Sequence, residues 1–287
     1  MKALYDVPAP AKLNLFLHVV GRRPDGMHLL QSVFMLIDWC DTLHFELRPQ
    51  GGISREDLGA ALPAQDLVLA AARALQQACG SGAGVHVAID KRIPSEAGMG
   101  GGSSDAASCL LALNRLWRLN LPLAQLARIG LALGADVPFF LHGRNAWVEG
   151  VGERSTPVAL PPARFAVVKP GEGLATARIF SDPQLKRDTE PAIISGFAAN
   201  PSADADPYRF GRNDLQPVAQ RLCAGVTQAL EWLGSQGLQG RMTGSGSAVF
   251  AQLPARQALQ AAPAGWQARE CGNMEVHPLA GWAPSDD

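Results

Sequence analysis

The stretch Lys91-Arg92-Ile93-Pro94-Ser95-Glu96-Ala97-Gly98-Met99-Gly100-Gly101-Gly102-Ser103-Ser104-Asp105-Ala106-Ala107 decides the fold. Before it, residues 85–89 alternate between apolar and smaller or polar side chains, as in a half-buried strand. After it, the apolar residues of 106–117 are spaced as on a buried helix. The sequence therefore predicts a strand, a glycine-rich loop and a helix, with Ser103 to Asp105 at the helix start.

The glycines of this loop favour an anion site. Four of the five residues from Gly98 to Gly102 are glycines, so side chains do not cover the backbone N–H groups. The unpaired N–H groups at a helix start and the positive end of the helix dipole attract a phosphate. Hydroxyl groups at the same point can also reach a phosphate or a magnesium ion. The alternative is a flexible loop in front of a well-capped helix.

Three familiar nucleotide-binding motifs do not fit this loop. A Walker A loop needs a lysine after the glycines, and none stands there. A dinucleotide fingerprint needs a third glycine where this chain has Ser103. The His-Arg-Asp loop of protein kinases is missing from the sequence.

Composition limits the class of protein. The chain has 287 residues, 47% of them hydrophobic and 18% charged, which allows a substantial core in one or two domains. A net charge of −1 argues against nucleic acid as the main partner. No apolar run is long enough to cross a bilayer, and residues 1–6 lack a signal-peptide core. The five scattered cysteines form no metal-binding spacing. We therefore expect a cytoplasmic protein with reduced thiols and no membrane or nucleic-acid partner.

Two segments outside the loop place polar groups beside apolar runs. Residues 11–19 alternate strictly, so the odd positions from Leu13 to Val19 share one face of a strand and the even positions share the other. Lys12 and Asn14 are then neighbours on the second face, for which the alternative is a solvated outer face. Asp136 stands between a helix that ends at Gly134 and an apolar run. Its carboxylate is either turned toward the interior, or it serves as a turn or capping residue.

The rest of the chain mixes strands and helices, which predicts an α+β fold. Asp66 is expected to cap a helix that ends at Gly80. We interpret 49–63 as a surface excursion, 157–162 as a linker and 182–206 as mostly loop with some helix. One amphipathic helix is predicted over 216–233, a short helix over 254–261 and a last strand near 267–278.

Several motifs together resemble the GHMP family of small-molecule kinases. Pro94 to Ser104 matches the family's second motif, Pro-x-x-x-Gly-Leu-Gly-Gly-Gly-Ser-Ser, with Met99 in the leucine position. Further matching segments are Pro10-Ala11-Lys12-Leu13-Asn14-Leu15, Arg23-Pro24-Asp25-Gly26-Met27-His28, Gly134-Ala135-Asp136-Val137-Pro138-Phe139, Glu149-Gly150-Val151-Gly152-Glu153, Asn213-Asp214-Leu215 and Met242-Thr243-Gly244-Ser245-Gly246. The resemblance covers the chain from about Pro8 to Pro278.

The resemblance implies a two-domain architecture with the active site between the domains. Residues 1–156 would form a ribosomal-protein-S5-like domain that carries the ATP loop, and residues 163–280 a ferredoxin-like domain. ATP would be the phosphate donor, with Mg²⁺ bridging phosphate oxygens through metal ligands that stay unknown. The acceptor would be a small alcohol that carries a cytidine group, and the active form a monomer or a weak homodimer.

The resemblance also implies roles for individual residues. Lys12 and Asp136 would flank the acceptor hydroxyl as the catalytic pair. The ATP site would comprise Pro94, Ser95, Glu96, Ala97, Gly98, Met99, Gly100, Gly101, Gly102, Ser103 and Ser104, with Asp66, Lys91 and Asp105 beside them. The substrate site would comprise Asn14, Met27, His28, Thr176, Phe180, Gly244 and Ser245. Within it, Phe180 and Met27 would be opposite walls of the cytosine pocket, and Met27 stands where a tyrosine is usual.

Three other functions stay open at this point. The chain could be a kinase of the same family with another acceptor, such as mevalonate or homoserine. It could be a dinucleotide-dependent oxidoreductase, which the broken fingerprint disfavours. It could be a nucleotide-binding module without catalysis, which the presence of both Lys12 and Asp136 disfavours.

Overall fold

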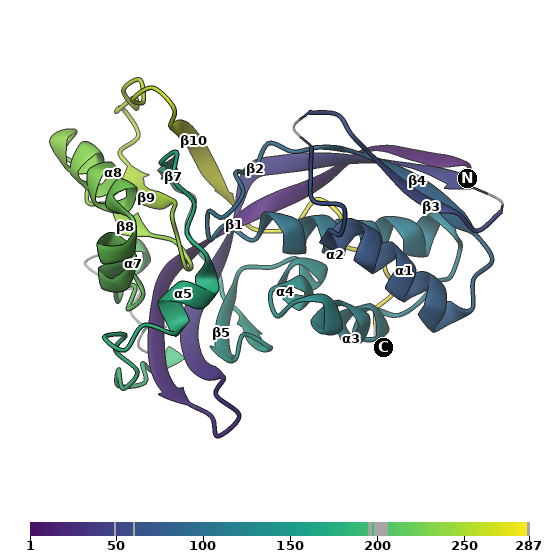
Figure 1. Ribbon diagram of the computed structural model, residues 1–287, viewed down its shortest axis with the longest axis horizontal. Helices are drawn as coiled ribbons and strands as arrows, with labels where there is room; N and C mark the ends of the chain where they lie inside the picture. Colours follow the sequence, from purple (N-terminus) through teal and green to yellow (C-terminus); the bar gives the residue numbers. More distant parts are fainter. Residues whose placement is uncertain (49, 60, 195–196, 198–205, 286–287) are drawn as a thin grey trace.

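The structure is a computed structural model that describes residues 1–48, 50–59, 61–194, 197 and 206–285 (Figure 1). The part of the expected loop 182–206 that falls on 195–196 and 198–205 lies outside the described residues. The elements follow in this order: β1 Ala3–Arg22, β2 His28–Arg48, β3 Ile53–Asp57, α1 Leu67–Cys79, β4 Gly84–Asp90, α2 Gly101–Leu116, α3 Leu123–Leu133, α4 Val137–His142, β5 Ala146–Gly150, β6 Arg154–Pro157, β7 Arg164–Lys169, α5 Thr176–Phe180, η1 Pro207–Arg209, α7 Gln216–Leu222, α8 Ala224–Ser235, β8 Arg241–Met242, β9 Val249–Leu253 and β10 Gln267–Met274.

Two long strands organise the molecule. β1 and β2 form an antiparallel hairpin that runs through both halves of the structure (Figure 1). The main path through the sheet is β3-β4-β2-β10-β7-β9-β8, and β1 and β5 also pair with β2. Among the strand pairs of the described residues, β3 and β4 run in parallel, and α1 is the crossover between them. Each long strand can therefore hold side chains at the junction of the halves.

Helices cover the two halves separately. α1, α2, α3 and α4 lie together against the first half of the sheet, and α7 and α8 cover β7, β8 and β9 in the second half (Figure 1). A third cluster, which includes Phe16, Trp147 and Phe165, joins the halves behind the hairpin. The predicted helix after Asp66 is confirmed: Asp66 accepts from the N–H of Leu69, and α1 ends at Gly80.

The strand, glycine loop and helix order is confirmed by β4 and α2. The predicted helix start at Ser103 to Asp105 is wrong, because α2 begins at Gly101. Gly100 caps it in the left-handed conformation, and no side chain caps it. The glycines themselves thus form the first turn of the helix.

The strict alternation predicted for residues 11–19 is also wrong in part. β1 shifts register between Asn14 and Leu17, so Phe16 joins the same core cluster as Leu13 while Leu17 turns to another. Such a bulge inserts one residue and reverses the faces that follow it. Lys12 and Asn14 come before the shift, and they do share a face.

Three other predictions are corrected. The expected surface excursion over 49–63 contains β3, which pairs with β4 from Ile53 onward. The single helix over 216–233 is two helices, because Cys223 takes an extended conformation between α7 and α8. The segment 254–261 is not helical, since the N–H of Leu259 bonds to Glu270 of β10 instead of a helical carbonyl.

Candidate active site

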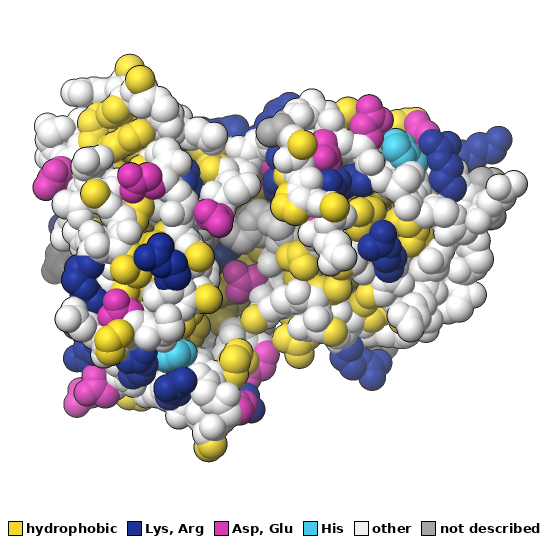
Figure 2. Space-filling view, in the orientation of Figure 1, with side chains coloured by type: hydrophobic (Ala, Val, Ile, Leu, Met, Phe, Trp, Pro, Cys, Tyr) yellow, Lys and Arg dark blue, Asp and Glu magenta, His cyan; other side chains and the backbone are white. Residues whose placement is uncertain are grey.

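A cavity of about 610 Å³ lies where the two halves meet. Figure 2 shows the surface hollowed at this junction. The glycine loop lies at its middle, residues 62–68 line one end, and Thr176, Phe180 and Ser245 line the other. A ligand that lies along the cavity therefore passes the glycine loop between its two ends.

The start of α2 presents backbone N–H groups to the cavity. Gly100 has a positive φ of 71°, which turns the chain into the helix. Gly101, Gly102 and Ser103 follow in the first turn, where a helix has no carbonyl partners for N–H groups. With the helix dipole they form a site for an anion.

A second loop, from Thr243 to Ser247, lies against the glycine loop. The N–H of Ser247 donates to the carbonyl of Glu96 at 3.0 Å, and the hydroxyl of Thr243 accepts from the N–H of Asn14 at 2.9 Å. A Cβ added at Gly98 would lie 2.3 Å from the carbonyl oxygen of Thr243. Only glycine permits this approach, which brings the second half of the chain to the phosphate site.

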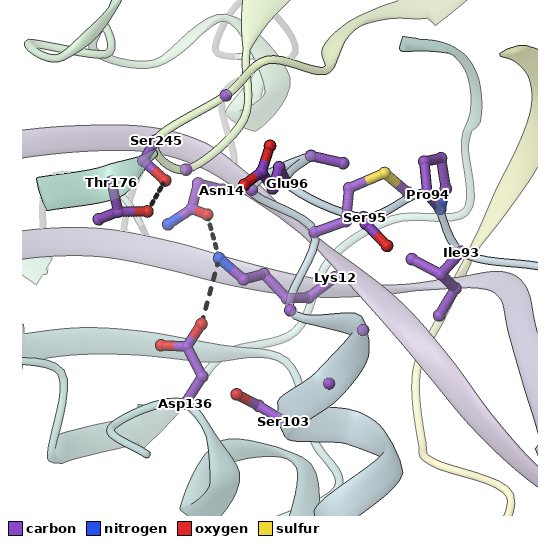
Figure 3. A pocket seen from close by; sticks show the side chains of 18 of the residues that line it. Lys12, Asn14, Ile93, Pro94, Ser95, Glu96, Ser103, Asp136, Thr176 and Ser245 are labelled. Atoms are coloured by element: carbon purple, nitrogen blue, oxygen red, sulfur yellow. Dashed lines mark hydrogen bonds and ion pairs between the residues drawn. The ribbon is translucent and has the colours of Figure 1, made fainter. Parts of the chain in front are cut away.

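Lys12 and Asp136 face each other beside the glycine loop (Figure 3). Their charged atoms lie 3.5 Å apart, and Lys12 also donates to the side-chain oxygen of Asn14. Burial lowers the pKa of Lys12, and the carboxylate of Asp136 opposes that shift. Asp136 stands at the start of α4 without bonding its N–H groups, so its carboxylate is available to a ligand. This arrangement can accept a proton and hold a hydroxyl in place.

A buried ion cluster supports the glycine loop from behind. Lys91 donates to Asp41 and to Asp105, and Asp41 also accepts from the N–H of Ile93 at 2.7 Å. Burial alone would lower the pKa of Lys91, but the carboxylates of Asp105 and Asp41 raise it. Lys91 and Asp105 both line the cavity, and their ion pair holds the entry to the loop.

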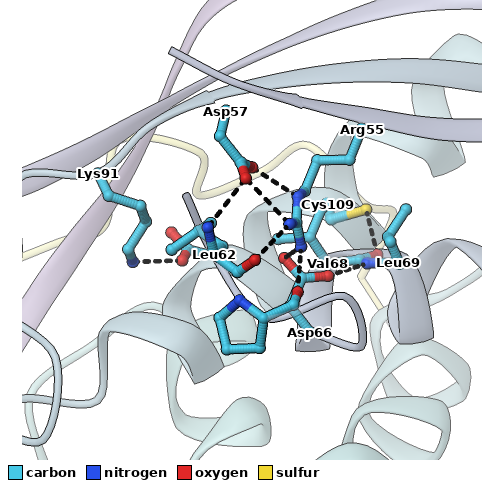
Figure 4. A network of polar contacts seen from close by, with 10 residues as sticks. Arg55, Asp57, Leu62, Asp66, Val68, Leu69, Lys91 and Cys109 are labelled. Carbon is cyan, nitrogen blue, oxygen red and sulfur yellow. Dashed lines mark hydrogen bonds and ion pairs between the residues drawn. The ribbon is translucent and has the colours of Figure 1, made fainter. Parts of the chain in front are cut away.

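A second polar network holds the far end of the cavity (Figure 4). Arg55 of β3 bonds Asp57 at 3.1 Å and Asp66 at 2.7 Å, and donates to the carbonyls of Leu62 and Pro63. Its side chain is 8% exposed. Leu62, Pro63 and Asp66 line the cavity, so Arg55 fixes this wall without lining it. The carboxylate of Asp66 is occupied by Arg55 and by the N–H that it caps.

We expect Arg55→Met to raise KM for a nucleoside triphosphate several-fold and to leave kcat nearly unchanged. The anion site lies beside the Lys12–Asp136 pair at the middle of the cavity. The base end of a nucleotide bound there points either to the wall at Leu62, Pro63 and Asp66 or to the opposite end at Phe180, and we expect the first of these. Loosening the 62–68 wall removes binding contacts far from the reacting atoms. Steady-state kinetics with each substrate varied in turn measures the effect.

Arg164→Met is the matched control for that variant. Arg164 bonds one carboxylate, that of Glu270, where Arg55 bonds two, and like Arg55 it donates to two carbonyls, those of Pro254 and Ala255, but it lies outside the lining of this cavity and its walls. Its KM values should stay as in the unaltered protein. An unchanged KM for the triphosphate in Arg55→Met would contradict the role given to the wall.

The opposite end of the cavity carries an aromatic pair. The rings of Phe180 and His28 lie 4.9 Å apart, and the Nε of Arg187 donates to Nε2 of His28 at 3.0 Å. Burial and then the charge of Arg187 lower the pKa of His28, which favours the neutral ring. The hydroxyl groups of Thr176 and Ser245 form a hydrogen bond of 2.7 Å across this end of the cavity (Figure 3).

The structure brings most predicted site residues to one cavity. The exceptions, which do not line it, are Met27, His28 and Ser104. His28 reaches the site through Phe180, whereas Met27 is 51% exposed and Ser104 is buried. The predicted Met27 wall opposite Phe180 is therefore absent from the described cavity lining. Sequence reasoning also missed Ser32, which lines the cavity, and the contacts of Arg55 and Arg187, since no local motif marks these residues.

The fold and the geometry of this site place the chain in a known class of proteins. Models of the family match residues 66–144, as the GHMP kinases N terminal domain, and residues 205–268, as the GHMP kinases C terminal. The chain belongs to the GHMP kinases. It is 70% identical over 286 residues to a 4-diphosphocytidyl-2-C-methyl-D-erythritol kinase from Albidiferax ferrireducens, in an alignment that covers 100% of this chain and 98% of that protein. A 4-diphosphocytidyl-2-C-methyl-D-erythritol kinase from Variovorax paradoxus is 65% identical over 295 residues, covering 99% of this chain and 100% of that protein.

Solved structures agree with this placement. A crystal structure of 4-(cytidine 5'-diphospho)-2C-methyl-D-erythritol kinase matches with a TM-score of 0.73 at 32% identity, over 94% of this chain and 99% of that chain. A homoserine kinase from Cytophaga hutchinsonii matches with a TM-score of 0.69 at 13% identity, over 96% of each chain. The second likeness shows the fold alone. The two-domain α+β architecture expected from the sequence is confirmed.

Proposed function

We propose that this chain transfers the γ-phosphate of ATP to the 2-hydroxyl of 4-diphosphocytidyl-2-C-methyl-D-erythritol. The products are the 2-phosphate and ADP, and the reaction belongs to isoprenoid precursor biosynthesis by the non-mevalonate route. The observation that carries the proposal is the Lys12–Asp136 pair beside the N-terminus of α2 in one cavity. The full-length identity to kinases of that name selects the acceptor.

The chemistry follows from the positions of the charged groups. Phosphoryl transfer leaves little covalent work to the protein, so positioning and charge stabilisation dominate. As the acceptor oxygen bonds to phosphorus, its proton passes to the carboxylate of Asp136. Lys12 holds that carboxylate and the hydroxyl in place, and the N–H groups of Gly101, Gly102 and Ser103 stabilise charge on the phosphates.

Magnesium fits this site as a partner of the phosphates. Among the described residues no group of three or more His, Cys, Asp or Glu side chains could hold a metal. The hydroxyl of Ser103 lines the cavity and is the oxygen donor that we assign to Mg²⁺, which commonly keeps several waters and phosphate oxygens as ligands. When bound, the ion would neutralise charge on the phosphates.

We place the enzyme in the cytoplasm as a monomer or a weak homodimer. All five cysteines are free, which suits a reducing compartment. Within the described residues, no helix has the length and apolar character needed to cross a membrane.

An acceptor comparison tests the function. ADP release should depend on the cytidylyl alcohol and stay at background with mevalonate, homoserine or no acceptor. Turnover with mevalonate or homoserine instead would reassign the acceptor within the family. ATP binding without ADP release for any acceptor would favour a binding module, and binding of NAD would favour an oxidoreductase.

We expect Phe180→Ala to raise KM for the cytidylyl substrate by roughly 2- to 10-fold, because a ring–ring contact contributes about 0.5–1.5 kcal/mol. Phe180 lines the acceptor end of the cavity, where it offers a flat face to the cytosine. Kinetics with free methylerythritol phosphate, which lacks the base, supplies the comparison. An equal loss with both acceptors would mean that Phe180 supports the fold and not the base.

A further inference from the structure

The side-chain amide of Asn14 lies between a hydroxyl and an ammonium group. Its nitrogen donates to the hydroxyl of Ser32 at 2.8 Å, and its oxygen accepts from Lys12. Ser32 belongs to β2 and is 2% exposed. None of the sequence motifs includes it.

The hydroxyl of Ser32 has a fixed direction. It donates its one proton to the carbonyl oxygen of Phe16, at the bulge in β1. A carbonyl oxygen can only accept, so Ser32 turns its lone pairs toward Asn14. The group of Asn14 that meets those lone pairs must be the NH₂. The amide oxygen is thereby directed at Lys12.

Lys12 has few groups that favour its charge. Asp136, from α4, is the charged partner at 3.5 Å. β2 contributes the ring of Phe34, whose centroid lies 4.4 Å from the ammonium, and the glycine loop contributes Gly100; neither carries a charge. Burial lowers the pKa of Lys12. An inverted Asn14 amide would set an NH₂ group against this ammonium and favour its loss of a proton.

We propose that Ser32 is a positioning residue, which orients the amide of Asn14 so that Lys12 stays protonated during phosphoryl transfer. The inference rests on the role of Lys12 in the proposed function. Ser32 lines the same cavity, and in this proposal it acts through Asn14.

The dependence of kcat on pH tests this role at saturating substrates. Activity that needs charged Lys12 is lost as pH rises through the pKa of Lys12, which gives an alkaline limb. In Ser32→Ala the limb should move to lower pH by about one unit, because the ammonium of Lys12 loses a well-oriented hydrogen bond that favours its charged form. Ser32→Thr keeps the hydroxyl and should keep the limb in place.

A second background separates orientation from damage to the fold. In Asn14→Asp, both side-chain oxygens accept, so orientation no longer matters. Adding Ser32→Ala to that background should not move the limb further. If the role of Ser32 is purely structural, Ser32→Ala will lower the melting temperature and leave the alkaline limb in place. That result would overturn the inference about Ser32 but not the proposed function.

The role of Lys12 is checked separately. Arginine keeps its charge at high pH, so Lys12→Arg should remove the limb from the measured range. A limb that stays unmoved in Lys12→Arg, or that is missing in the unaltered enzyme, would overturn both the inference and the assigned role of Lys12. The inference is supported if the alkaline limb moves in Ser32→Ala but not in Ser32→Thr, if Ser32→Ala adds no further movement to Asn14→Asp, and if Lys12→Arg removes the limb.

Discussion

An Asp136→Asn enzyme is expected to lose between about 10²- and 10⁴-fold in kcat, the usual cost of removing a positioned base. The amide keeps the size of the side chain but cannot take the proton of the acceptor hydroxyl. Asp136 makes no bond to the N–H groups of α4, so its loss should leave the helix intact. ATP affinity, measured by calorimetry, should change little, because we expect the phosphates to bind the N–H groups of α2.

Asp206→Asn is the matched control for this substitution. The side chain of Asp206 is 32% exposed and lies 3.6 Å from Arg209, compared with 30% and 3.5 Å for Asp136 and Lys12. It does not line the active-site cavity. The control should turn over normally. Near-normal turnover in Asp136→Asn as well would remove that residue from the mechanism.

Replacing Gly100 by alanine should weaken ATP binding by at least about tenfold. Its φ of 71° is a left-handed conformation that costs an L-residue roughly 1–2 kcal/mol. The new Cβ would also lie 3.0 Å from the ring of Phe140 and 3.3 Å from Cε of Lys12. Relief of these contacts must displace the start of α2, the ring of Phe140 or the side chain of Lys12, so we expect kcat to fall too.

Gly237→Ala separates backbone strain from the effect on the site. Gly237 has a similar φ of 74°, and a Cβ there meets no atom within 4 Å. Both variants should lose comparable melting temperature from the left-handed backbone, but only Gly100→Ala should lose ATP affinity. Equal ATP affinity in the two variants would place the phosphates elsewhere.

Local patterns were enough to predict the parts of the fold that depend on neighbours in sequence. The glycine run between a strand and a helix was recognisable, and so were the cap at Asp66 and the end of α1 at Gly80. The bulge in β1 was not, because its position depends on the register with β2. The break at Cys223 follows from how α7 and α8 pack on the sheet, which no periodicity records.

The same limit applies to the site. Lys12 and Asn14 are two residues apart on one strand, so alternation alone placed them together. Asp136 is 124 residues from Lys12, and only the resemblance to a family joined them. Ser32 and Arg187 act through partners that are distant in sequence, Asn14 and His28. Their roles require the folded chain.

The position of β10 has a consequence for how the protein is made. This strand, 267–274, pairs with β7 along its length and with β2 at Ile37 and Leu36. On the ribosome it emerges after every other strand of the sheet. Until then the edges of β2 and β7 that it will cover are open to pairing with other chains. Synthesis of β10 therefore completes the sheet, and a delay before it emerges prolongs the interval in which the nascent chain is prone to aggregate.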